Sequence, residues 1–222
     1  MAYILNIETA TTNCSVSLSN KGETLVLKED YGNGFSHAEK LHVYIEAVLK
    51  ESKIEAHQLD AIAVSKGPGS YTGLRIGVST AKGLCYALNK PLISISTLKA
   101  LAHQVKIEEG VIVPMLDARR LEVYSAIFDK QFNSVRAIEA QILDKNSFKE
   151  ELNNGKVYFI GNGVEKTKTL IKNPNAFFIE SKLPSANQMT LLSYNKYKKN
   201  DTEDVAYFEP FYLKDFVGIK AK

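Results

Sequence analysis

A glycine-rich stretch in the first half of the chain has the residue types of a turn that binds an anion. It runs from Lys66 to Gly77 and joins a buried apolar run at 60–65 to a segment of helical apolar spacing at 72–88. A turn between a strand and a helix points backbone N–H groups and the positive end of the helix dipole at one spot. Such a spot suits a phosphate. A purely structural turn is the alternative that these residues leave open.

The stretch differs from the two familiar phosphate-binding patterns. No Gly-Lys-Ser or Gly-Lys-Thr closes it, as a Walker A loop requires. Gly67 and Gly69 could begin a dinucleotide-binding fingerprint, but the third glycine, Gly73, comes one residue late. The stretch alone therefore identifies no ligand.

No histidines or cysteines have the spacing of a metal site. His37 and His42 are five residues apart, about 140° around a helix, so they cannot share a metal ion. We expect surface or helix-capping roles for the four histidines. Cys14 and Cys85 lie in apolar contexts and outside any Cys-x-x-Cys pair, and no Gly-x-Ser-x-Gly elbow is present. The sequence thus predicts no metal site and no catalytic residue.

The densest group of charged residues consists of Asp117, Arg119, Arg120 and Glu122. It lies at a turn between two predicted strands. Three interpretations remain open: a solvated hairpin turn with an internal ion pair, a polar wall of a cleft, or a contact for a partner.

The helix predicted at 72–88 has a wide face of small and apolar residues. Its interior glycines, Gly77 and Gly83, each cost about 1 kcal/mol relative to alanine. The face spans about 200°, which predicts contact with the sheet on one side and with another helix at close range on the other. Alternatively, the glycines face a bulky neighbour in the same domain.

The expected mate is a helix at 36–50, which begins with Ser36 and Glu39 at capping-box spacing. We predict a contact between two chains, built from both helices. The residues expected at this partner-binding face are Leu41, Tyr44, Ile45, Val48, Gly73, Gly77, Thr80 and Leu84.

Strands and helices alternate in an order that predicts an α/β protein of two lobes. Strands are expected at 2–7, 13–18, 23–29, 60–65, 91–95, 111–116, 122–128, 135–142, 156–160 and 176–179, and further helices from 98, from about 163 to 172 and at 185–199. The first three strands should form an antiparallel meander. We place one lobe at 1–100 and the other at 101–222, with a C-terminal segment able to pack back on the first lobe.

Composition narrows the class of protein. The net charge of +3 is too small to indicate nucleic-acid binding by itself. No leader peptide or apolar run of 18 residues is present, so a cytoplasmic protein without membrane contact is expected.

Several motifs together resemble those of the TsaB family, formerly called YeaZ. They are Ile4-Leu5-Asn6-Ile7-Glu8-Thr9-Ala10-Thr11, Cys14 to Leu18, Lys66 to Gly77, Ala81-Lys82-Gly83-Leu84, Leu116 to Tyr124 and Pro210-Phe211-Tyr212-Leu213. The resemblance covers nearly the whole chain. It implies an actin-like fold, with a mixed sheet and helices in each lobe.

The resemblance also implies a function. Proteins of this family are non-catalytic activating or scaffold subunits in the synthesis of threonylcarbamoyladenosine beside the anticodon of tRNA. They pair with a catalytic paralogue, TsaD, with a small ATPase, TsaE, and with themselves, and they meet tRNA only through the complex. No tightly bound cofactor is implied. ATP or ADP is expected only at the interface of the assembled complex, where Glu8, Gly67, Gly69 and Ser70 would be the nucleotide-binding residues.

Two departures from enzymatic relatives support a subunit rather than an enzyme. In the catalytic sibling a His-x-x-x-His metal pair follows a strand that begins Pro-Leu, and on Pro91-Leu92 those positions fall on Thr97 and Leu101. No glycine follows Glu8, where actin-like ATPases have a glycine-bearing turn. The alternative function is a metal-independent hydrolase of the glycoprotease superfamily or a small-molecule kinase, for which Glu8 and Asp117 are the candidate bases.

Overall fold

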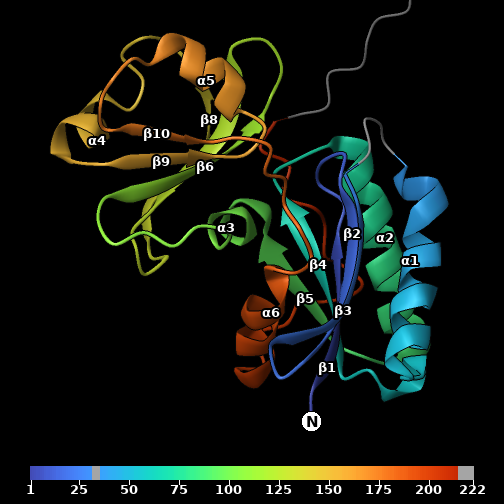
Figure 1. The fold of residues 1–222 in the computed structure, drawn as a ribbon. Coiled ribbons are helices and arrows are strands. Elements are labelled where there is room, and N and C mark those ends of the chain that lie inside the picture. The colour runs from blue at the N-terminus through green and yellow to red at the C-terminus, as the bar shows by residue number, and fades with distance from the viewer. Residues whose placement is uncertain (32–35, 215–222) are drawn as a thin grey trace, which may run out of the picture.

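The computed structural model describes residues 1–31 and 36–214 and contains two lobes, each built on a five-stranded mixed sheet (Figure 1). The first sheet has the order β3-β2-β1-β4-β5, with strands β1 (Tyr3–Glu8), β2 (Cys14–Asn20), β3 (Glu23–Asp30), β4 (Ala61–Gly67) and β5 (Leu92–Ser96). The second has the order β10-β9-β6-β7-β8, with strands β6 (Val111–Asp117), β7 (Glu122–Phe128), β8 (Ser134–Ile142), β9 (Val157–Ile160) and β10 (Ala176–Ile179).

The two sheets have the same connectivity. In the first, β1 pairs antiparallel with β2 and parallel with β4, and β2 pairs antiparallel with β3. In the second, β6 pairs antiparallel with β7 and parallel with β9, and β7 pairs antiparallel with β8. The antiparallel meander predicted for the first thirty residues is confirmed. Each lobe therefore has a turn between its first two strands and a strand-to-helix turn after its fourth.

Helices cover both faces of the first sheet (Figure 1). Helices α1 (His37–Ser52) and α2 (Tyr71–Leu88) lie on one face, and α6 (Met189–Lys198) lies on the other. Helix α3 (Thr97–Ala102) follows β5 and reaches the second lobe, where Leu98 and Leu101 join its core. The short helices are η1 (Ala56–Gln58), α4 (Lys149–Asn154) and α5 (Val164–Leu170).

The chain returns to the first lobe after β10. Ala186 and Met189 pack in one cluster with Ile4 of β1, so α6 belongs to the first sheet rather than to the second lobe. The following segment crosses α2, and the backbone N–H of Phe211 donates to the carbonyl oxygen of Lys66 at 2.7 Å. Beyond it, Lys214 forms an ion pair with Glu122 of the second lobe.

The predicted elements are present, with one clearly shifted end and one additional helix. Helix α6 begins at 189 rather than 185, and the helix at 149–154 was not predicted. The capping box at the start of α1 is wrong, because the Ser36 side chain makes no capping hydrogen bond and its hydroxyl donates to Asp30 instead. Its partner in the pattern, Glu39, is an exposed residue of the first turn.

Candidate functional site

A cavity of about 730 Å³ lies between the lobes. The first lobe contributes residues 10–12, 68–73 and the start of α1, and the second contributes residues 116–119 with Tyr124 and Asn162. Residues 211–214 of the returning segment form a further wall. The volume is typical of a pocket for a small molecule.

The glycine-rich turn faces this cavity, but its backbone N–H groups at the start of α2 already donate hydrogen bonds within the chain. The backbone N–H of Ser70 donates to the carbonyl oxygen of Ala10 at 2.7 Å. The Ser70 hydroxyl caps α2 by accepting from the N–H of Gly73 at 3.3 Å. A Cβ atom on Gly69 would lie 2.5 Å from the Ala10 oxygen, so the turn between β1 and β2 fills the space in front of Gly69.

The two glycines that follow on α2 face the same turn. A Cβ atom on Gly73 would lie 2.1 Å from the carbonyl oxygen of Thr9, and one on Gly77 would lie 2.2 Å from the Thr9 hydroxyl. The Thr9 hydroxyl donates to the carbonyl oxygen of Gly73 at 2.8 Å. These glycines therefore admit a neighbour within the same lobe, which is the alternative the sequence left open. The close helix-to-helix contact predicted at Gly73 and Gly77 is wrong, and Thr9 is the residue that sequence reasoning missed.

The remaining predicted nucleotide-binding residues lie outside the cavity wall. Glu8 is fully buried, and its Oε1 accepts from the N–H of Ala10 at 2.6 Å and from the Ser65 hydroxyl at 2.8 Å. Burial raises the pKa of the Glu8 carboxyl to about 7, although both hydrogen bonds act in the opposite direction. The N–H of Gly67 donates to the Thr97 hydroxyl at 3.2 Å.

These contacts decide whether a phosphate fits the glycine-rich turn. Backbone atoms of the β1–β2 turn already lie where a phosphate would meet Gly69 and Gly73. Because the donors of a phosphate cradle must face open space, the predicted cradle at Glu8, Gly67, Gly69 and Ser70 does not fit a nucleotide phosphate in this structure.

The predicted partner-binding face is only partly at the surface. Leu41 and Val48 have no exposed area and Ile45 is buried, because all three pack on the first sheet. They belong to the core and cannot contact a partner. Tyr44, Thr80 and Leu84 of the same prediction are partly exposed.

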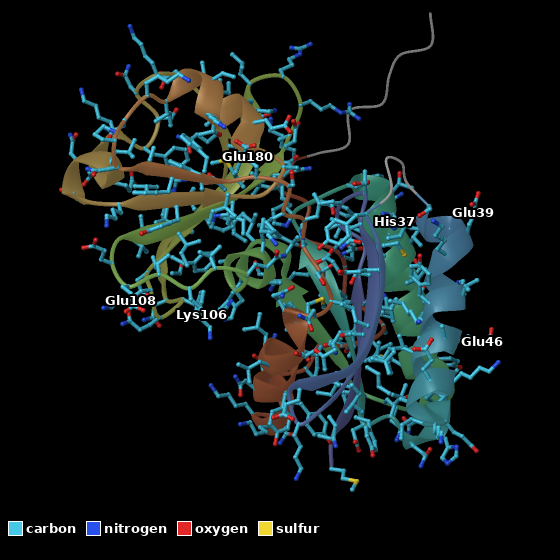
Figure 2. All side chains as sticks on the ribbon, viewed as in Figure 1. His37, Glu39, Glu46, Lys106, Glu108 and Glu180 are labelled. Atoms are coloured by element: carbon cyan, nitrogen blue, oxygen red, sulfur yellow. The ribbon has the colours of Figure 1, made fainter. Side chains whose placement is uncertain are left out.

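Other residues of the two helices are far more exposed. Val43 of α1 is 59% exposed and Tyr86 of α2 is 88% exposed. Glu39 and Glu46 also project from α1 on the side away from the sheet (Figure 2). In the sequence, Val43 is an apolar residue that lies outside the apolar stripe of its helix, and that position is the signal that would have found it.

The charged group at 117–122 forms the hairpin turn between β6 and β7. Arg119 and Arg120 both have positive φ angles, 71° and 49°. Nearby groups hold the turn: the N–H of Arg119 donates to Asp117 at 2.6 Å, and Lys166 donates to the carbonyl oxygen of Arg120 at 2.7 Å. Asp117 itself receives an ion pair from Lys166 at 2.9 Å. The turn is therefore both strained and fixed in place.

His37 and the two residues at the positions of the sibling's metal pair, Thr97 and Leu101, are buried. His37 is buried, with its Nε2 2.6 Å from the carbonyl oxygen of Thr11, so the expected surface or capping role is wrong for it. Thr97 and Leu101 are both buried on α3, with Leu101 in an apolar cluster. Among residues 1–31 and 36–214, no three His, Cys, Asp or Glu side chains are grouped so that they could hold a metal ion.

The family of the chain follows from comparison with known proteins. A family model described as TsaD: tRNA N6-adenosine threonylcarbamoyltransferase matches residues 33–221. The TsaB protein of Haemophilus influenzae is 29% identical over 98% of this chain and 95% of its own length. The TsaB protein of Buchnera aphidicola subsp. Schizaphis graminum is 30% identical over 93% of this chain and 84% of its own length. The chain belongs to this family, in its TsaB (YeaZ) branch.

Solved structures agree with the TsaB assignment and give the fold. YeaZ from Pseudomonas aeruginosa is 25% identical and superposes with a TM-score of 0.79, covering 96% of this chain and all of that chain. The fold is the two-lobed actin-like α/β fold, as predicted. Within the described residues, every helix is too short or too polar to cross a membrane.

Proposed function

We propose that this chain is a non-catalytic activating subunit in the synthesis of threonylcarbamoyladenosine in tRNA. The relatives at about 30% identity carry the name of that pathway, and the matching family model is that of the transferase. The chain works in the cytoplasm by pairing with a catalytic relative of the TsaD type. A TsaE-type ATPase, a second copy of the chain and, through the complex, tRNA are its further partners.

The proposed pairing with the catalytic relative rests on one observation. Helices α1 and α2 lie side by side on one face of the first sheet, and each presents an exposed apolar residue, Val43 and Tyr86. Aromatic side chains are enriched at protein contacts, and Tyr86 is 88% exposed. We therefore place the contact with the catalytic relative on the outer face of both helices, not on Leu41, Ile45, Val48, Gly73 and Gly77.

The absence of catalysis in this chain is supported by what its residues offer. Thr97 and Leu101 occupy the positions of the sibling's metal pair and have no imidazole. Of the two carboxylates considered for a hydrolase or kinase, Glu8 is buried behind the β1–β2 turn and Asp117 is paired with Lys166. ATP or ADP, where the reaction needs it, is bound at the interface of the assembled complex.

The test is reconstitution of modified adenosine from the catalytic paralogue, the ATPase, the adenylate-forming enzyme and this chain. Val43→Glu with Tyr86→Glu should abolish pairing and lower the yield of modified tRNA at least tenfold. The matched control is Val135→Glu, because Val135 lies in the second lobe with the same exposed fraction, 59%. Unchanged pairing of the double variant would place the contact elsewhere, and full yield without the chain would refute the proposal.

A further inference from the structure

A groove of about 300 Å³ lies where the returning segment runs alongside α2. Among the described residues, Tyr212 alone lines both this groove and the cavity between the lobes. Lys82 of α2 holds the segment in place, because its Nζ donates to the carbonyl oxygens of Ala206 and Phe208, both at 3.0 Å. Phe208 also packs against the core of the first lobe. The groove is therefore a fixed part of the first lobe.

The Arg75 guanidinium, at one end of this groove, is held by two tyrosine rings. Its central carbon lies 4.1 Å from the ring centroid of Tyr71 and 5.9 Å from that of Tyr212. Its Nε donates to the Tyr212 hydroxyl at 3.2 Å. Stacking on aromatic rings fixes the plane of a guanidinium and leaves its other N–H groups available as donors. Arg75 is thus set in one orientation before any partner binds.

No carboxylate forms an ion pair with Arg75 in the part of the chain that the structure describes, and its two Nη atoms make no hydrogen bond there. Glu209 lines the same groove but lies beyond ion-pair distance. The hydrogen bond to Tyr212 and, to a smaller extent, the Glu209 charge raise the pKa of Arg75, so the guanidinium stays charged. Because Arg75 is exposed, a carboxylate from outside the chain can reach both Nη atoms.

Arg75 lies on the same side of α2 as the exposed Tyr86. The two residues are 11 positions apart, which is three turns of a helix or about 16 Å along its axis. Between them, Lys82 binds the returning segment on both sides of Tyr207, which is 84% exposed. The proposed partner contact at Tyr86 therefore continues over the returning segment to Arg75. Tyrosine and arginine are the residues that most often dominate the energy of a protein contact.

We propose that Arg75 binds an Asp or Glu carboxylate of the catalytic relative in the groove between α2 and the returning segment. This rests on the proposed pairing and extends its contact from Tyr86 to Arg75. A guanidinium donates two parallel hydrogen bonds to a carboxylate, which an ammonium cannot do. A phosphate of tRNA has similar oxygens, but the exposed carboxylates of Asp204 and Glu209 on the same segment disfavour a polyanion.

Titration calorimetry of the full chain with the catalytic paralogue tests this site. Arg75→Gln should weaken pairing at least tenfold, and Arg75→Lys at least threefold, because lysine keeps the charge but not the stacked plane. Glu209→Gln should tighten pairing about twofold, since it removes a carboxylate that competes for Arg75. The matched control is Arg120→Gln, an exposed arginine of the second lobe that lies outside the groove, and it should change pairing less than twofold.

A double-mutant cycle identifies the matching carboxylate. Among Asp→Asn and Glu→Gln variants of the paralogue, one should weaken pairing tenfold with the unmodified chain but less than twofold with the Arg75→Gln chain. The proposal is overturned if Arg75→Gln, folded by circular dichroism, pairs as tightly as the unmodified chain, or if no paralogue carboxylate couples to Arg75. Unchanged pairing with weakened tRNA binding by the complex would assign Arg75 to RNA instead. If the unmodified chain does not pair, the proposed function fails, and this site with it.

Discussion

The two lobes repeat one topology and use it in opposite ways. In each, a turn joins the first two strands at the cavity, and the first strand ends with an acidic residue, Glu8 or Asp117. In the first lobe the acid is buried and the turn packs on α2. In the second lobe the acid is exposed and its turn presents Arg119 to the cavity. The same scaffold thus seals one turn into the core and leaves the other at the wall of the cavity.

The glycines after the fourth strands show how this difference arises. In the first lobe, Gly69 and Gly73 let the β1–β2 turn approach α2, a helix of 18 residues. In the second, Gly163 lets the side chains of Val123 and Met115 approach the start of α5, which has only seven residues. The comparison agrees with the proposed placement of the partner contact on the first lobe.

The largest expected effect is on the pH dependence of stability, through Glu8. Its pKa is about 7 in the folded chain against 4.5 ordinarily, so the folded state is disfavoured as pH rises from 4.5 through 7. The free energy of unfolding should fall by up to about 3 kcal/mol over that range. Glu8→Gln should remove this fall while leaving stability at pH 4 unchanged.

Urea unfolding at pH 4, 6 and 8 measures this effect. Asp117→Asn, the corresponding change in the second lobe, is the control and should leave the Glu8 contribution in place. A Glu8→Gln chain with the pH dependence of the unmodified protein would show that the two acids do not differ in the way described.

The next effect tests the seal between the β1–β2 turn and α2. Gly77→Ala places a methyl group 2.2 Å from the Thr9 hydroxyl and should lower the free energy of unfolding by about 2 kcal/mol. Thr9→Ala removes that hydroxyl, so the double variant should recover most of the loss. Additive effects of the two changes, measured in a double-mutant cycle by urea unfolding, would mean that the two residues do not touch.

A smaller effect of opposite sign is expected at Gly83 on the same helix. Nothing lies within 4 Å of a Cβ atom there, so Gly83→Ala should stabilise the chain by up to about 1 kcal/mol. Thermal unfolding measures both glycine variants under one condition. A loss of stability at Gly83 would show that helix α2, rather than its contact with the turn, determines the cost at Gly77.

The smallest effect concerns the link between the returning segment and the second lobe. Lys214 is about half exposed, and exposed ion pairs contribute little. Lys214→Gln should therefore change the free energy of unfolding by less than about 1 kcal/mol. A larger loss, seen by urea unfolding at low and high salt, would make this ion pair a main tie between the lobes.

Local patterns in the sequence predicted most of the fold. Apolar alternation and turn residues identified the strands, and the motif combination identified the family. The neighbour that the α2 glycines accommodate could not be predicted, because Gly73 and Gly77 contact Thr9, which is 64 and 68 residues away along the chain. The ion pairs of the second-lobe turn were equally hidden, since Asp117 and Glu122 pair with Lys166 and Lys214, which lie far along the chain.

The most direct test of this difference between the lobes is an NMR titration of the ¹⁵N-labelled chain with AMP. The amide signals of Gly69 and Gly73, which face the β1–β2 turn, should stay unchanged at millimolar AMP, because the Ala10 and Thr9 oxygens fill the space in front of them. Shifts confined to Gly69 and Gly73 would show that the first-lobe turn is open to phosphate and would contradict the account.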